Sequence, residues 1–210
     1  MKKSKFFIVL LVLLLLFVLL FLVPIAFKFF IIKDLNAKLT EIIDTSNNYI
    51  IEIKSNDRDT MYYNKVSVLN DDIRLDKKLF SLDTDNYTKW IYDNNSKENI
   101  MTGLNGETNT FIQEYPAVEL ESKIINPYNL YFSKEGFGEL LKTKITTITY
   151  NNKECYLIQN SFYNYAIVDK NTGLLYEQPN GYSTKNGNDI STIFIYNYTF
   201  NTLTEDVFHQ

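Results

Sequence analysis

The chain is organised around the stretch FFIVLLVLLLLFVLLFLVPIAF, which runs from Phe6 to Phe27. These 22 residues include no charge and no glycine, and Pro24 is the one residue that strongly disfavours a helix. A helix of this length would measure about 33 Å, which is enough to cross a hydrocarbon core of about 30 Å. Because the residues that follow stay mostly apolar, we predict a transmembrane signal-anchor over residues 6–32.

Lysines flank the apolar stretch unequally. Three lie within residues 1–5 beside the amino terminus, whereas only Lys28 and Lys33 follow it closely. The more positive flank of a membrane helix stays in the cytoplasm, so we expect a cytoplasmic tail at 1–5 and the bulk of the chain outside a bacterial cell membrane. A cleavable signal peptide would have an apolar core of about 7–15 residues and a small-residue cleavage site. The longer core here favours a permanent single-pass anchor.

The chain beyond the anchor is acidic. Sixteen of the 21 basic residues and all 25 acidic residues follow Lys33, so this part has a net charge of −9. Nucleic-acid binding needs clustered Lys and Arg, and we therefore expect no nucleic-acid partner. One cysteine, Cys155, and one histidine, His209, exclude an internal disulfide, a cysteine zinc cluster and Ser-His or Cys-His catalysis within the chain. We expect Cys155 to be a buried structural thiol.

Aspartate pairs at predicted turns are the remaining candidates for catalysis, which would need them to share a cleft. These pairs are Asp57 and Asp59, Asp71 and Asp72, and Asp83 and Asp85. Aspartate is common in turns because its side chain bonds the local backbone. We therefore predict a protein that is not an enzyme and has no metal or cofactor. An enzyme with carboxylate chemistry is a remote alternative.

The pattern next to the anchor predicts an amphipathic helix over Asp34–Ser46, ending at residue 48. Its apolar residues fall at i, i+4, i+7 and i+8, namely Leu35, Leu39, Ile42 and Ile43. Asp34 has the side chain of a helix cap. We expect this helix either to fold back on the domain or to extend stiffly from the anchor.

Residues 49–210 alternate apolar and polar side chains and predict an antiparallel β domain. The expected strands are Tyr49–Lys54, Thr60–Leu69, Ile73–Phe80, Tyr87–Tyr92, Asn99–Met101, Thr108–Gln113, Thr143–Tyr150, Glu154–Asn160, Tyr163–Val168, Leu174–Gln178 and Ile190–Phe200. No helix of crossover length separates them, so the strands pair antiparallel. Tyr115–Leu141 contains prolines and glycines and predicts an insertion with short helices. The fold class is therefore α+β, an open half-barrel wrapped on short helices.

The last strand, Ile190–Phe200, has two partly apolar faces. One interpretation is an ordinary strand between a core and a covering helix. The other is a concave sheet whose inner face forms an apolar ligand groove. The residues that we predict to line this groove are Trp90, Tyr128, Tyr131, Phe132, Tyr196 and Tyr198.

The C-terminal third resembles the LolA/RseB-like superfamily of periplasmic lipoprotein carriers and sigma regulators. The resemblance covers Thr143–Phe208 well and Asp34–Tyr92 only in pattern. The motifs that carry it are a D-x-x-T-G-L hairpin and a looser acidic-to-Phe turn, at Asp169, Thr172, Gly173 and Leu174, then Asn201, Asp206 and Phe208. It implies an unclosed antiparallel barrel around helices, with a hydrophobic cavity that accepts acyl chains in the carriers.

The chain departs from the carriers because it keeps a membrane anchor and ends soon after the second motif. We therefore expect a tethered chaperone or sensor that binds lipidated or apolar envelope components without catalysis. Its expected partners are the lipid bilayer, through residues 6–32, and either lipoprotein acyl chains or another envelope protein. The alternative is a structural or assembly partner in a cell-envelope complex, since the anchor leads almost directly into the folded part.

Overall fold

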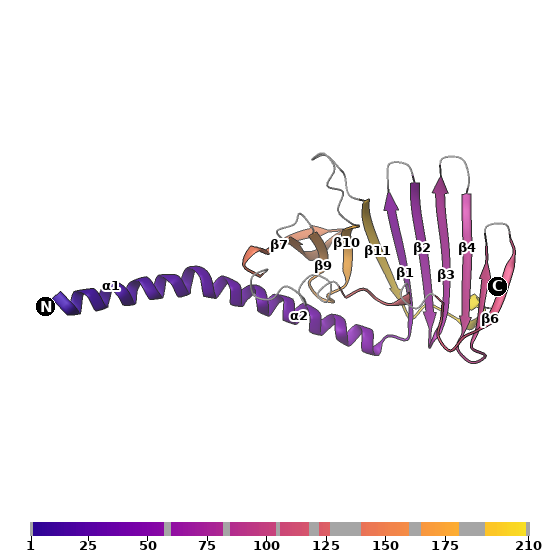
Figure 1. Cartoon of the computed structure of the whole chain (residues 1–210), viewed down its shortest axis with the longest axis horizontal. Coiled ribbons are helices and arrows are strands. Elements are labelled where there is room, and N and C mark those ends of the chain that lie inside the picture. The colour runs from indigo at the N-terminus through magenta and orange to yellow at the C-terminus, as the bar shows by residue number, and fades with distance from the viewer. Residues whose placement is uncertain are drawn as a thin grey trace.

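The computed structural model describes residues 2–56, 60–81, 85–103, 106–117, 122–126, 140–159, 165–180 and 192–208. The chain begins with a helix in three consecutive segments, α1 (Lys2–Phe17), the π-helical turn η1 (Val18–Leu22) and α2 (Val23–Thr45). An antiparallel sheet follows. Figure 1 shows α1 projecting away from the sheet, whereas α2 lies along it.

The π-helical turn lies directly before Pro24. The amide of Val23 bonds the carbonyl of Val18, five residues earlier. A proline ring in a regular helix would clash with the carbonyl four residues before it, and the wider turn relieves this crowding. The helix bends between α1 and α2, as expected at a proline preceded by a π-helical turn (Figure 1).

By length and composition, the helical run Phe6–Thr45 is the one in the described part of the chain that is long and apolar enough to cross a membrane. N-terminal signal sequences share this property. The predicted amphipathic helix is not separate from it, because α2 continues without a break through Asp34. The Asp34 carboxylate does not cap a helix but pairs with Lys38 at 2.6 Å. No residue between Phe27 and Asp34 interrupts a helix, so the helix propagates.

The sheet consists of two meanders joined side by side. Its strands are β1 (Asn48–Asn56), β2 (Thr60–Leu69), β3 (Asp72–Ser81), β4 (Asp85–Asp93), β5 (Glu98–Thr102), β6 (Thr108–Ile112), β7 (Lys144–Tyr150), β8 (Lys153–Gln159), β9 (Tyr165–Asp169), β10 (Leu175–Asn180) and β11 (Thr192–Phe200). The order is β6-β5-β4-β3-β2-β1-β11-β10-β9-β8-β7, with antiparallel pairing throughout. The predicted α+β class and the antiparallel sheet are confirmed.

The face of the sheet that packs on α2, here called the inner face, carries the hydrophobic core. Register aligns its residues in rows across the strands. One row consists of Trp90, Leu75, Val66, Ile51 and Tyr198, each the partner of the next on β4, β3, β2, β1 and β11. Leu35 and Leu39 of α2 are fully buried in the same core. Burial of this apolar face against α2 is therefore what joins helix to sheet.

The D-x-x-T-G-L motif forms the hairpin between β9 and β10. The Asp169 carboxylate accepts hydrogen bonds from the amides of Asn171 and Thr172 at 2.7 and 3.1 Å. Gly173 has a φ of +74°, in the left-handed region that glycine adopts without a steric cost. A Cβ at Gly173 would overlap the carbonyl oxygen of Leu35. The hairpin therefore needs glycine at this position for two reasons, the left-handed backbone angle and the close approach to α2.

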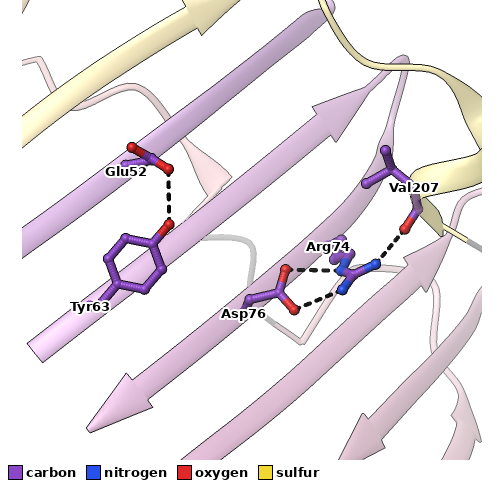
Figure 2. Close-up of polar contacts among 5 residues, drawn as sticks. All are labelled: Glu52, Tyr63, Arg74, Asp76 and Val207. Atoms are coloured by element: carbon purple, nitrogen blue, oxygen red, sulfur yellow. Dashed lines mark hydrogen bonds and ion pairs between the residues drawn. The ribbon is translucent and has the colours of Figure 1, made fainter. Parts of the chain in front are cut away.

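The C-terminal segment, which ends in the 3-10 helix η2 (Glu205–Phe208), lies on part of the opposite, outer face, where it contacts β3. Figure 2 shows Arg74 of β3 between the carboxylate of Asp76 and the carbonyl of Val207. The guanidinium donates to both Asp76 oxygens at 2.9 and 3.0 Å and to Val207 at 2.6 Å. Phe208 is buried beside this contact. The ion pair within β3 orients the Arg74 guanidinium, and the hydrogen bond from Arg74 to Val207 holds the C-terminal segment on the sheet.

Candidate functional site

A pocket of about 450 Å³ opens on the inner face, at the ends of β1 to β4. Its floor is a second cross-strand row, formed by Tyr49, Val68, Ile73 and Tyr92, each paired with the next. The other lining residues are Asp71, Asn94, Lys97, Glu114, Tyr115, Pro116, Ser122 and Lys123. This volume is within the usual range for small-molecule sites.

The connection from β6 to β7 forms the wall opposite the floor. Because β6 and β7 are the two edges of the sheet, the chain between them has to pass from one edge to the other. Its described parts, 113–117 and 122–126, lie over the inner face. The Asn126 side chain reaches α2, where it donates to Asn36 at 2.9 Å.

Three side chains on this part of the sheet hold the connection in place. The Tyr49 hydroxyl donates to the carbonyl of Ser122 at 2.8 Å. The Tyr92 hydroxyl donates to the carbonyl of Glu114 at 3.0 Å. Asn99, the strand partner of Tyr92, accepts a bond from the amide of Ala117 at 2.9 Å. Burial raises the pKa of Tyr49, so its hydroxyl stays protonated as a donor.

We expect Tyr92→Phe to loosen the pocket wall. The variant loses one hydrogen bond, which costs about 1 kcal/mol of unfolding free energy. Amide hydrogen exchange in residues 113–117 should become faster. Tyr63→Phe is the matched control, because it removes a hydroxyl that bonds Glu52 at 2.9 Å on the outer face (Figure 2). Equal acceleration in both variants would contradict a specific role for Tyr92.

The floor and mouth of the pocket differ in polarity. Val68 and Ile73 are buried and apolar, whereas Asp71 and Tyr115 at the mouth are exposed. Lys97 also lines the mouth, so the mouth of the pocket carries both a negative and a positive charge. Such a pocket suits an amphipathic ligand whose apolar part rests on the floor and whose polar part remains near water. Among the described residues, no three His, Cys, Asp or Glu side chains come together in a group that could hold a metal ion.

The three predicted groove residues that the structure describes, Trp90, Tyr196 and Tyr198, are not among the lining residues of this pocket. Of these three, Trp90 is the nearest to the floor, because it lies two residues before Tyr92 on the same face of β4. Tyr196 and Tyr198 lie on the same face in β11, but they pack within the core. Tyr128, Tyr131 and Phe132 are outside the described residues.

The two β11 tyrosines make different contacts. The Tyr196 hydroxyl accepts a bond from the amide of Gln178 at 2.8 Å, and both side chains are buried. The Tyr198 hydroxyl is buried without a hydrogen-bond partner in the described structure. Burial raises the pKa of Tyr198 well above its ordinary value, and the neighbouring Tyr196 and Tyr176 add to the shift. This position fits the alternative that β11 lies between a core and a covering helix.

Sequence reasoning missed the floor row. Tyr49, Val68, Ile73 and Tyr92 were expected in strands, but their alignment depends on the register of four strands. The signal that was available is parity, since Tyr92 faces the same side as Trp90. The missing information was which strands lie beside each other and where the connection crosses.

A second cluster of polar groups lies between β7 and β10. The hydroxyls of Tyr150 and Tyr165 donate to the two oxygens of Glu177 at 2.9 and 2.5 Å. Burial, and then the bond to Glu177, raises the pKa of Tyr150 to about 12. Cys155 is fully buried, as predicted, and burial raises the pKa of its thiol. The raised pKa values keep the Tyr150 and Tyr165 hydroxyls and the Cys155 thiol protonated, and a protonated thiol is a poor nucleophile.

The fold and the pocket define a class: an apolar N-terminal helix joined to a large open antiparallel sheet with a pocket on its inner face. No family model and no curated protein matches the chain. Among solved structures, the chain is similar to a DUF1329 family protein from Desulfovibrio piger ATCC 29098. The identity is 9%, the match covers 89% of this chain and 97% of that one, and the TM-score is 0.33. A likeness this distant carries no argument, so the LolA/RseB resemblance stays a prediction.

Proposed function

We propose that the protein is a membrane-tethered binding protein of the bacterial envelope. Residues 6–32 anchor it, the N-terminus is cytoplasmic, and the domain outside binds an apolar or lipidated envelope component without catalysis. Membership of the LolA/RseB-like superfamily is part of this proposal. The observation that carries it is the pocket with an apolar floor and a charged mouth between the sheet and the β6–β7 connection.

Two features support binding of a ligand with an apolar segment. The floor row is continuous across four strands, so the base of the pocket is lined by apolar and aromatic side chains, of which Val68, Ile73 and Tyr92 are buried. Tyr115, which lines the mouth, is 60% exposed and therefore has aromatic surface to give to a ligand. Aromatic side chains with a polar end are suited to such half-wet positions.

The alternative, an assembly partner of an envelope complex, is favoured by a different feature. β6 is an edge strand without a charged side chain, and Ile112 at its end is 81% exposed. An exposed, uncharged edge is a template for pairing with a strand of another protein. In this alternative the pocket remains empty and β6 forms the contact.

The proposal is tested with Trp90, the single tryptophan of the chain, as a reporter beside the pocket. The full chain is placed in lipid nanodiscs and titrated with a peptide acylated by a brominated fatty acid, which quenches nearby tryptophan. We expect saturable quenching that the unbrominated acyl peptide reverses. Absence of saturable quenching would overturn the proposal, and co-purification of a stoichiometric protein partner would then favour the assembly alternative.

A matched pair of variants locates the binding site. Tyr115→Ser removes exposed aromatic surface from the pocket mouth, and we expect it to weaken binding about tenfold, equivalent to about 1.4 kcal/mol. Ile112→Ser removes exposed apolar surface that does not line the pocket, and it should leave the affinity unchanged. Equal weakening in both variants would place the ligand elsewhere on the domain.

A further inference from the structure

The distribution of exposure along the helix marks where the domain begins. Val23 is 52% exposed, and residues 6–22 are likewise exposed apart from the half-buried Val18, whereas Ile25 is 6% exposed. From there a stripe of buried residues continues at Ile32, Leu35 and Leu39. No linker separates the exposed part from the packed part, because the helix is continuous.

The exposed part alone is long enough to cross a membrane. Phe6 to Pro24 is 19 residues, which corresponds to roughly 28 Å of helix, close to the hydrocarbon thickness of about 30 Å. The residues after Pro24 that contact the domain therefore lie at the headgroup level of the bilayer. A domain that touches the helix at this level has no room to stand away from the lipid.

The domain surface at this point is apolar with a basic border. Lys28 reaches across to the helical turn before β7 and donates to the carbonyls of Leu140 and Leu141 at 3.3 and 3.4 Å. Leu141 is 50% exposed, and Phe27 and Phe30 are each 65% exposed on the neighbouring helix. These large apolar side chains gather where helix and domain meet.

Charge around this meeting point is opposite to that of the domain. Residues 25–33 and 140–149 together contain four lysines, and the acidic residues that border these ranges are Asp34, which pairs with Lys38, and Glu139, whereas the part of the chain after Lys33 has a net charge of −9. Lys33, Lys142 and Lys144 are all exposed. Anionic lipid headgroups attract such lysines, and an acidic domain would otherwise be repelled from them.

We propose that the folded domain sits directly on the bilayer, with Phe27, Phe30 and Leu141 in the headgroup region and the lysines against lipid phosphates. We call this contact between the domain and the bilayer the seat, and it depends on the anchoring part of the proposed function. Along α2, Ile25 and Thr45 are separated by roughly 30 Å. β1, which carries Tyr49 of the pocket floor, begins just after the end of α2 (Figure 1), so the floor lies at the end of α2 away from the lipid. A ligand therefore enters the pocket from the aqueous side.

The seat is tested by depth-dependent quenching. Variants of the full chain with one added cysteine carry an environment-sensitive fluorophore at Leu141→Cys, Phe30→Cys, Leu15→Cys or Ile112→Cys, in vesicles of phosphatidylcholine and phosphatidylglycerol. The native Cys155 is fully buried, and wild-type protein treated in parallel measures any background labelling. Spin labels on lipid headgroups or deep in the acyl chains act as quenchers.

We expect headgroup quenchers to reduce emission at Leu141→Cys and Phe30→Cys more than deep quenchers do. The Leu15→Cys label should respond to the deep quenchers, and the Ile112→Cys label, at the far end of the sheet, to neither. If only the Leu15→Cys label is quenched, the anchor holds but the domain stands off, and the seat is overturned. If the Leu15→Cys label is not quenched by any lipid, anchoring and seat both fail.

Discussion

Gly173→Ala should destabilise the domain more than any other substitution of a glycine in the described structure. The added Cβ would overlap the Leu35 carbonyl oxygen and would lie 3.1 Å from the Leu39 Cβ. Backbone of a packed helix cannot move aside as a flexible side chain would. The left-handed φ adds about 1–2 kcal/mol and the overpacking about 1–3 kcal/mol, so we expect a total loss of about 2–5 kcal/mol. Urea unfolding of the full chain in micelles, followed by Trp90 emission, measures this loss.

Gly106→Ala is the matched control for this experiment. Gly106 has nearly the same φ, +79°, but a Cβ there meets nothing within 4 Å. The control therefore carries the conformational cost alone, about 1–2 kcal/mol. The difference between the two losses of unfolding free energy therefore measures the cost of the steric clash between the hairpin and α2. Equal losses would show that the hairpin does not depend on contact with the helix.

Local features of this fold could be predicted from the sequence because they depend on local physics. Period-2 alternation located the strands, and the short polar turns required antiparallel pairing. The glycine of the β9–β10 hairpin was also predictable, since a left-handed residue ends many such turns. What the sequence could not show is that β1 pairs with β11. That pairing joins segments more than a hundred residues apart, and no local pattern encodes it.

Local sequence patterns also failed to locate the candidate site, because the site depends on how distant strands pair. Trp90 and Tyr198 were predicted to share a face, and register places them in one row, but α2 packs over the β11 end of that face. The apolar character of Tyr198 was predicted correctly and its role was not determined, because a core and a groove select the same side chains. The pocket instead depends on Tyr49 and Tyr92, whose hydroxyls hold a connection that sequence alone did not place.

Asp169→Ala should cause the second large loss of stability. The carboxylate is 4% exposed and accepts hydrogen bonds from two backbone amides and from the Tyr176 hydroxyl at 2.7 Å. Alanine leaves the buried Tyr176 hydroxyl and the amides of Asn171, which is exposed, and Thr172, which is half-buried, without their acceptor. Each such donor costs about 1–3 kcal/mol, so we expect a loss of about 3–5 kcal/mol after partial relaxation. Lys153 donates to the Tyr176 hydroxyl at 2.7 Å. In the alanine variant this hydroxyl no longer has the Asp169 carboxylate as its acceptor.

Asp169→Asn is the control, because it keeps an oxygen for the two amides and changes only the charge and the contact with Tyr176. We expect its loss to be smaller, about 1–2 kcal/mol. A loss as large as that of Asp169→Ala would mean that the negative charge, and not the backbone bonds, holds the hairpin. Urea unfolding at neutral pH distinguishes the two results.

The stability gap between wild type and Asp169→Asn should also depend on pH. Burial alone would raise the pKa of Asp169, but the bonds from Tyr176, Asn171 and Thr172 outweigh it and hold the pKa below its ordinary value. A carboxylate with a lowered pKa stabilises the fold above the ordinary value of about 4 and loses that contribution as the pH falls through its folded pKa. The gap should therefore be constant at neutral pH and narrow below about pH 4. A gap that persists unchanged into stronger acid would mean that the hairpin does not select the charged form of Asp169.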